Sequence, residues 1–306
     1  MRIVFMGTPD FAVPSLQALI DAGHDVCAVY TQPDKPQGRK QILTAPPVKT
    51  LALEHDIPVF QPNTLKNEDE QARLRELAPE VIIVVAYGKL LPKAVLDIPP
   101  HGCINVHGSL LPRWRGAAPI QRSILEGDER TGVSIMRVAH ELDAGAWCRQ
   151  ASVQIGEKDA ATLTAELAQL GAEELVGALP ELAAHEETWH EQDESQVTFA
   201  AKIKKAEMRL DPADPASANA RRVQAAGDTA PARTAVAGRG VRVMAARVAA
   251  DLLVPQGGVV VEHGRVGLGC SDGTLELLRV KPDGKREMEA SAWAAGLRGE
   301  LSWERI

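Results

Sequence analysis

The sequence predicts an α/β protein in which a mostly parallel sheet, covered by helices on both faces, precedes a small β-barrel domain. Unbroken apolar runs such as Arg2–Met6 and Val81–Tyr87 alternate with helix-like segments, as in parallel sheets that are buried on both faces. The chain turns polar and acidic after residue 186. After about Lys205, short β-like runs alternate with Gly-rich turns, which is typical of small barrels.

Local signals place the elements of this fold. Gly7 ends the first strand, and Pro14 suits the first turn of a helix that ends near Gly23. Further strands are expected at 25–31, 57–60, 81–87, from 103 onward, 132–138 and 147–153, and further helices at 48–55, 68–77, 119–126 and 161–184. The barrel strands are expected at 241–248, 259–261, 266–268 and 275–280.

The length of 306 residues suits one large domain or two ordinary ones. We expect a Rossmann-like domain over residues 1–186, a linker over 187–204 and a barrel domain over 205–306. The net charge is −7, but the part from Lys205 onward carries 15 Lys and Arg against 13 Asp and Glu. That slight positive balance is compatible with transient RNA contact and equally with chance.

Composition excludes several classes of protein. The four cysteines form no C-x-x-C pair and the eight histidines no H-x-x-x-H, so we expect reduced thiols and no bound metal. No apolar run approaches the ~18 residues that span a bilayer. The opening MRIVFMGTPDF is too short for a signal peptide, so a cytoplasmic protein is expected.

Three common nucleotide and hydrolase motifs are missing. A dinucleotide site needs G-x-G-x-x-G after the first strand, but this chain has GTPDF. The place of the second glycine falls near Pro9. No G-x-x-x-x-G-K-[ST] and no G-x-S-x-G occur either. A bound NAD or ATP and a serine hydrolase are therefore disfavoured.

Polar groups gather at the expected strand CINVH. Asn105 and His107 stand two residues apart and should project to the same face, and Gly108 allows a sharp turn after them. Asp143 adds a carboxylate in D-A-G, where Gly145 permits a tight turn. By themselves these residues also fit an ordinary strand end and an ordinary turn.

The surrounding motifs resemble those of the methionyl-tRNA formyltransferases. They are N-x-H-x-S-L-L-P from Asn105, R-W-R-G-A-A-P-I-Q from Arg113, T-G-V-S-I-M from Thr131, L-D-A-G from Leu142, M-G-T-P-D-F-A from Met6 and V-V-A-Y-G-K-L-L-P from Val84. The resemblance is dense over the first two thirds of the chain. It implies a Rossmann-like catalytic domain, a linker and an oligonucleotide-binding-like barrel.

The resemblance also implies the reaction. The formyl group of 10-formyltetrahydrofolate would pass to the α-amino group of methionine on initiator tRNA. Because a tertiary anilinic nitrogen is a fairly good leaving group, we expect direct attack without a covalent enzyme intermediate. Asn105 and His107 would donate hydrogen bonds to the oxygen that becomes negative, and Asp143 would carry the proton and orient His107.

Two sets of binding residues follow from the same resemblance. The folate would lie against the S-L-L-P turn and the end of the strand before it: Ser109, Leu110, Leu111, Pro112, Val85, Tyr87 and Gly88. The tRNA would meet a Pro/Gly-rich basic loop and a second surface turn around Trp114: Lys35, Arg39, Lys40, Lys49, Arg113 and Arg115. Packing of Trp114 onto the body of the protein fits the sequence equally well.

Several positions depart from the family pattern. Gln41 and Ile42 dilute the basic loop, and Ala139-His140-Glu141 replaces an acidic-glycine pair before L-D-A-G. In the C-terminal part, Asp211-Pro212 replaces Asp-Trp, and residues 227–233 lack the usual tryptophan. These changes are expected to weaken the core of the barrel and to leave the catalytic set untouched.

Two other functions stay open. A folate formyltransferase that acts on a small amine, such as an amino sugar or a glycinamide nucleotide, would share the catalytic set. The other alternative is a ligand-sensing or RNA-binding module without this activity. Nothing in the sequence demands a dimer, so a monomer is expected.

Overall fold

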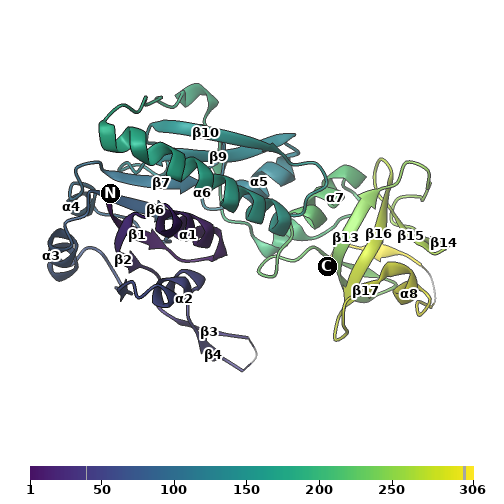
Figure 1. Ribbon diagram of the computed structural model, residues 1–306. Coiled ribbons are helices and arrows are strands. Elements are labelled where there is room, and N and C mark those ends of the chain that lie inside the picture. Colours follow the sequence, from purple (N-terminus) through teal and green to yellow (C-terminus); the bar gives the residue numbers. More distant parts are fainter. Residues whose placement is uncertain (39, 299–300) are drawn as a thin grey trace. The chain divides into compact units, whose positions relative to one another are not determined.

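The computed structural model describes residues 1–38, 40–298 and 301–306 (Figure 1). The chain forms two compact units. The first comprises Met1–Pro119, Arg130–Gln154 and Thr164–Ala200, and the second comprises Ile120–Glu129, Ile155–Leu163 and Ala201–Ile306. Residues 187–200 of the expected linker therefore pack with the first unit.

A seven-stranded sheet forms the centre of the first unit, with the order β10-β9-β7-β6-β1-β2-β5. The pairs from β7 to β5 are parallel, and β9 and β10 add antiparallel strands at one edge. The strands are β1 (Arg2–Gly7), β2 (Asp25–Tyr30), β5 (Val59–Phe60), β6 (Val81–Val85), β7 (Cys103–His107), β9 (Arg130–Arg137) and β10 (Trp147–Gln154). The predicted mostly parallel sheet is confirmed.

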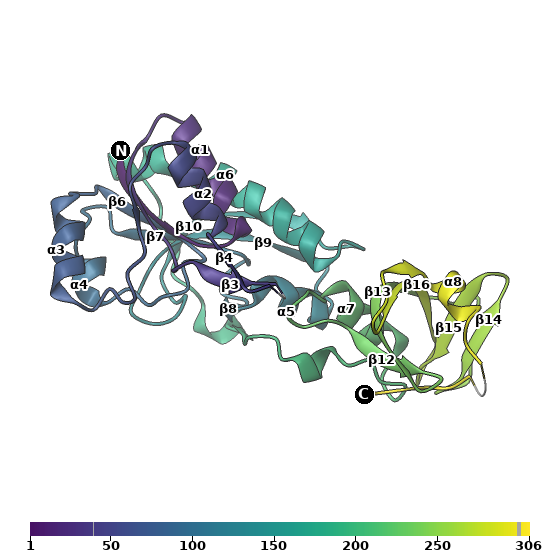
Figure 2. The same cartoon turned by 90° about the horizontal axis from the view of Figure 1, so that it is seen from below.

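Alternate residues of the buried strands face two separate cores, because successive side chains of a strand point to opposite faces. In β1, Ile3 and Phe5 belong to one core, and Val4 and Met6 belong to the other. The first core packs against α1 (Val13–Asp21), α2 (Pro47–Glu54) and α6 (Ala160–Ala184), and the second against α3 (Glu68–Glu76) and α4 (Lys93–Leu96) (Figure 2).

Two small pairs of strands accompany this sheet. β3 (Lys35–Gln37) and β4 (Ile42–Thr44) form an antiparallel hairpin that projects from the first unit (Figure 1). The expected basic loop therefore contains a short hairpin, because the segment pairs with itself. β8 (Arg115–Gly116) pairs in parallel with β11 (Phe199–Ala200), across a long separation in sequence. The short 3₁₀ helices are η1 (Asp10–Ala12), η2 (Glu194–Gln196) and η3 (Lys205–Met208).

The second unit holds an antiparallel sheet with the order β14-β15-β16-β13-β12-β18. It nearly closes into a barrel, since Val259 N donates to Leu301 O at 3.0 Å and Trp303 N donates to Gly257 O at 3.0 Å. Its elements are α5 (Pro119–Glu126), α7 (Ala216–Gln224), β12 (Arg233–Val236), β13 (Arg239–Val248), β14 (Val259–Glu262), β15 (Arg265–Gly269), β16 (Thr274–Pro282), β17 (Met288–Glu289), α8 (Ala290–Ala294) and β18 (Trp303–Glu304). This confirms the predicted barrel.

The core of the barrel contains aromatic side chains that come from outside the region where the sequence lacks a tryptophan. Trp293 of α8 and Trp303 of β18 are buried among the aliphatic residues of the strands. The indole Nε1 of Trp303 donates to Gly269 O at 2.9 Å, so its polar atom is satisfied. The barrel thus has large buried side chains despite the small residues at 227–233.

Candidate active site

The strand β7 brings Asn105 and His107 to one face of the sheet, as predicted. Ile104 and Val106 are buried in the core beneath α6, so the alternating residues Asn105 and His107 lie on the opposite face. His107 ends the strand opposite Ser134 of β9. The pair therefore stands where a parallel strand ends, which is where open α/β sheets bind ligands.

The turn after His107 is held by side chains of the two antiparallel strands. The Ser134 hydroxyl donates to Ser109 O at 2.7 Å and accepts from Leu111 N at 3.1 Å. The Gln150 amide donates to Leu111 O at 2.9 Å and to the Ser134 hydroxyl at 2.8 Å. Ser134 and Gln150 were not predicted as site residues. The signal for Ser134 was present in T-G-V-S-I-M, where it stands inside an apolar strand.

Both nitrogens of the His107 imidazole have defined neighbours. Nε2 lies 2.9 Å from Trp114 O, and it must donate because a carbonyl only accepts. Nδ1 faces Asp143 Oδ2 at 3.7 Å, which is too long for a direct hydrogen bond. With Nε2 committed to Trp114, Nδ1 is the nitrogen that remains for a substrate or for a bridging water.

Asp143 is placed by the tight turn that the D-A-G motif predicts. It adopts a left-handed backbone with φ of 50°, and its Oδ2 accepts a hydrogen bond from Gly116 N at 2.9 Å. A Cβ at Gly145 would lie 2.0 Å from Arg137 O, so only glycine fits there. The Asp143 side chain is 18% exposed, so it can still exchange a proton with a bound molecule.

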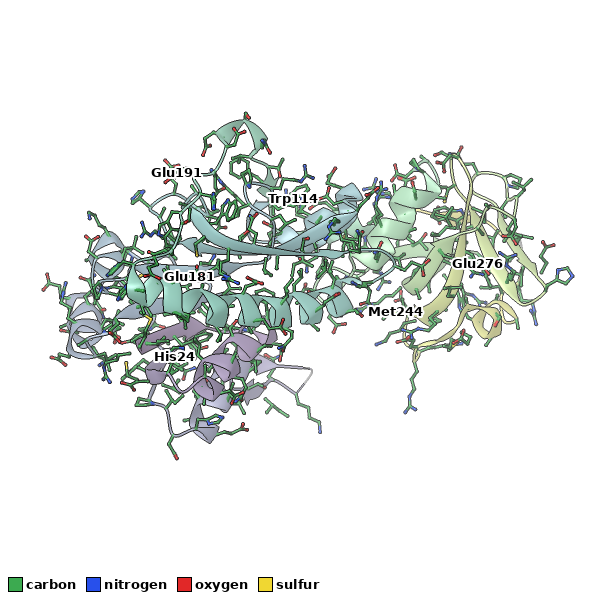
Figure 3. All side chains as sticks on the ribbon, turned by 45° about the horizontal axis from the view of Figure 1, so that its top comes forward. His24, Trp114, Glu181, Glu191, Met244 and Glu276 are labelled. Atoms are coloured by element: carbon green, nitrogen blue, oxygen red, sulfur yellow. The ribbon has the colours of Figure 1, made fainter. Side chains whose placement is uncertain are left out.

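Trp114 packs onto the body of the first unit, which is one of the two expected positions, and Arg115 beside it is buried, so the expected surface position of Arg115 is wrong. Trp114, which is labelled in Figure 3, is 8% exposed, and the Arg115 side chain is 4% exposed. The reason is the pairing of β8 with β11, in which Trp114 N donates to the Thr198 hydroxyl at 2.9 Å and Arg115 N donates to Thr198 O at 2.9 Å.

Arg115 is bound inside the first unit. Its Nε donates to Gln192 Oε1 at 2.8 Å and its Nη2 to Glu194 Oε1 at 2.8 Å. These contacts leave its guanidinium unsuited to the predicted role in binding tRNA. Arg113 is exposed and stays a candidate, and its guanidinium carbon lies 5.1 Å from the centre of the Trp114 ring.

The residues predicted to contact folate differ in which of their atoms a ligand could reach. The side chains of Val85 and Tyr87 are buried in the two separate cores, so only their backbone could touch a bound molecule. The carbonyl of Tyr87 accepts from the Thr8 hydroxyl at 3.1 Å and from the Gln32 amide at 3.0 Å. Gly88 is exposed, Leu110 and Pro112 are partly exposed, and Ser109 and Leu111 are buried.

The predicted basic loop is the β3–β4 hairpin. Lys35 and Lys40 are exposed, and Arg39 lies outside the described residues. Beside them, Ile42 and Leu43 are 63% and 65% exposed, so an apolar edge accompanies the cations.

Lys49 is committed to an ion pair at the base of this hairpin. Its Nζ lies 2.8 Å from Asp34 Oδ2 and 3.0 Å from Gln61 Oε1. Hydrogen bonds from Lys49 and Gln61 hold the pKa of Asp34 below its usual range. A structural role at the ends of the hairpin therefore fits Lys49 better than the predicted contact with tRNA.

Within the described ranges 1–38, 40–298 and 301–306, no cluster of three or more His, Cys, Asp or Glu is arranged to hold a metal ion. Across the same residues, none of the helices is both long and apolar enough to cross a membrane. Cys103 begins β7 beside the site, but burial raises the pKa of its thiol to about 12, which makes it a poor nucleophile.

Comparison with known proteins identifies the family. The formyl transferase family matches residues 1–179, and the formyl transferase C-terminal domain matches residues 202–298. The methionyl-tRNA formyltransferase of Methylococcus capsulatus is 51% identical over 294 residues, or 95% of each chain. That of Hydrogenovibrio crunogenus is 47% identical over 297 residues, or 96% of this chain and 95% of its own.

The chain therefore belongs to the formyl transferase family and is an enzyme. Within that family it groups with the methionyl-tRNA formyltransferases, as both relatives are named.

Solved structures of low sequence identity share the fold. HypX from Aquifex aeolicus, in complex with tetrahydrofolic acid, matches with a TM-score of 0.63 at 17% identity, covering 99% of this chain and 50% of that one. WlaRD, a sugar 3N-formyl transferase, matches with a TM-score of 0.68 at 14% identity, covering 94% of this chain and 99% of that one.

Proposed function

We propose that this enzyme transfers the formyl group of 10-formyltetrahydrofolate to the α-amino group of methionine on initiator tRNA, in the cytoplasm and as a monomer. The observation that carries the proposal is the meeting of His107 and Asp143 beside Asn105 at the end of β7, in a chain whose full-length relatives are methionyl-tRNA formyltransferases. An amide, an imidazole and a carboxylate can supply the oxyanion stabilisation and the proton transfer that formylation of an amine needs.

The reaction is a direct transfer between two nitrogens. The methionine amine attacks the formyl carbon, and negative charge develops on the formyl oxygen of a tetrahedral intermediate. The Asn105 amide donates to that oxygen. Because His107 Nε2 already donates to Trp114 O, a donor at Nδ1 requires the imidazolium form of His107, whose second N–H stabilises the same oxygen. The C–N bond to the folate then breaks, and tetrahydrofolate leaves.

Asp143 handles the proton in this scheme. The attacking amine must lose one proton and the departing folate nitrogen must gain one. The partly exposed carboxylate of Asp143, held by Gly116 N and facing His107, accepts the first and returns it directly or through a water. The balance needs no covalent enzyme intermediate and no further reactant.

In this proposal, the folate and the tRNA contact different residues of the enzyme. The pteridine ring lies against Leu110 and Pro112 of the turn and against the backbone near Gly88, which are the exposed parts of the predicted set. The tRNA phosphates bind Lys35, Lys40 and Arg113.

The test is formyl transfer from 10-formyltetrahydrofolate to methionine-charged initiator tRNA, with uncharged tRNA as the control. Formyl-methionyl-tRNA should form, and its formation at subsaturating tRNA should weaken as salt rises because phosphate contacts release counterions. Absence of this product, together with formylation of an amino sugar or another small amine, would contradict the proposed acceptor.

A further inference from the structure

The side chain of Gln192 holds the Asp143 backbone in its left-handed conformation. A φ of 50° is uncommon for a residue other than glycine and persists where the surroundings hold it. The Gln192 amide donates to Asp143 O at 2.8 Å and to Gly145 O at 2.8 Å. One buried side chain therefore fixes both ends of the turn that carries the carboxylate.

Arg115 determines which way the Gln192 amide points. The Arg115 Nε donates to Gln192 Oε1 at 2.8 Å, so the NH₂ end of the amide must face Asp143 and Gly145. A buried guanidinium needs acceptors, and Glu194 supplies another at 2.8 Å. We call Arg115, Gln192 and Glu194 the brace.

The dipeptide Arg115-Gly116 connects the brace to the Asp143 carboxylate. Gly116 N donates to Asp143 Oδ2, while the preceding residue Arg115 orients Gln192, which holds Asp143 O. The same turn supplies Trp114 O to His107 Nε2. A shift of the turn would therefore change the position of Asp143 relative to His107.

We propose that Gln192 is a positioning residue that sets the Asp143 carboxylate relative to His107, with Arg115 as its orienting partner. The proposal rests on the proposed function of Asp143 as the group that handles the proton. Reacting groups must be held within a fraction of an ångström, and a misplacement of ~1 Å can cost about 10²-fold in rate. Gln192 thus acts on turnover without touching either substrate.

The first test is Gln192→Leu, which keeps much of the side-chain volume and removes both donated hydrogen bonds. The turnover number should fall by about 10- to 100-fold, with KM for folate and for the acceptor within about threefold of wild type. The matched control is Gln196→Leu, because Gln196 is exposed nearby and its amide bonds only to Asp193 in the described contacts. That control should keep wild-type turnover.

A double-mutant cycle separates positioning from general damage. If Gln192 acts through Asp143, adding Gln192→Leu to Asp143→Ala should cost nothing further in turnover. A loss in the double variant equal to the product of the two single losses would overturn the proposal, as would a Gln192→Leu enzyme that turns over within threefold of wild type.

Arg115→Lys provides a second route if Gln192→Leu does not fold. Lysine keeps the charge and can still reach Glu194, but it lacks the planar fork that holds Gln192. Turnover should fall by roughly 3- to 10-fold with KM unchanged, and this loss should also vanish in the Asp143→Ala background. Unchanged turnover would overturn the proposal.

The assay distinguishes a failure of this inference from a failure of the proposed function. Wild-type turnover with charged tRNA tests the acceptor. The brace is tested by ratios between variants, measured as loss of the formyl donor with whichever amine the wild-type enzyme formylates.

Discussion

Two carboxylates, one in each unit, show how differently an acidic side chain can be used. Glu276 of the barrel, which is labelled in Figure 3, is 4% exposed. Its Oε1 accepts from Arg265 Nε at 2.8 Å, and its Oε2 accepts from Arg247 Nε at 2.9 Å and from Arg265 Nη2 at 2.9 Å. These contacts lower its pKa to about 2. Its hydrogen-bonding capacity is taken up by the protein.

The Asp143 carboxylate is less committed. Among the described residues, the hydrogen bond it accepts comes from Gly116 N, and His107 Nδ1 stands at 3.7 Å. The rest of its environment holds its backbone, through Gln192. The comparison teaches that a carboxylate saturated by arginines stabilises the fold, whereas one fixed through its backbone keeps oxygen atoms available for a substrate.

Substitutions at the active site and at Glu276 should differ most in their effect on the turnover number. Asn105→Ala and His107→Ala should each lower turnover by about 10²-fold or more, because each removes a donor to the developing oxyanion. Glu276→Gln should leave turnover unchanged. Rates are measured as formation of formyl-methionyl-tRNA at saturating folate, and activity within threefold of wild type in either alanine variant would contradict the assignment.

A smaller effect is expected from the hairpin. Lys35→Ala and Lys40→Ala should each lower kcat/KM for charged tRNA by roughly 3- to 10-fold and reduce the slope of its logarithm against log salt by about one, as expected for a lost phosphate contact. Lys66→Ala is the control, since Lys66 is exposed on the first unit outside the hairpin. Equal effects of Lys66→Ala would contradict a specific role of the hairpin in binding tRNA.

The structural role of Glu276 should appear in the free energy of unfolding. Glu276→Gln should lower the unfolding free energy at pH 7 by about 2 kcal/mol, because charge-assisted hydrogen bonds are lost. The folded pKa of about 2 lies below the ordinary 4.5, so the stabilisation is full above about pH 4.5 and declines as pH falls toward 2. Urea unfolding of both proteins should show this gap narrowing with acid, and a gap independent of pH would contradict it.

Much of the fold and the centre of the site follow from local sequence. The alternation in CINVH places Asn105 and His107 on one face, and D-A-G predicts the tight turn at Asp143. Unbroken apolar strands predict the two-sided sheet, because each strand must be buried on both faces.

The parts that sequence did not predict depend on contacts between distant residues. Arg115 belongs to a two-residue strand whose partner is Phe199, so nothing near it in sequence indicates burial. Lys49 forms its ion pair with Asp34 after the chain folds back, and Gln61 joins from a separate strand end. The role of Gln192 was missed for the same reason, because its partners lie dozens of residues away in the sequence.

The most direct test of the central claim is single-turnover formyl transfer by Asp143→Asn, with charged initiator tRNA and saturating 10-formyltetrahydrofolate. Asparagine keeps the shape and can still accept from Gly116 N, but it cannot take a proton. The account predicts folate binding within threefold of wild type and a transfer rate at least about 10²-fold slower. A transfer rate close to wild type would show that Asp143 does not handle the proton and would contradict the account.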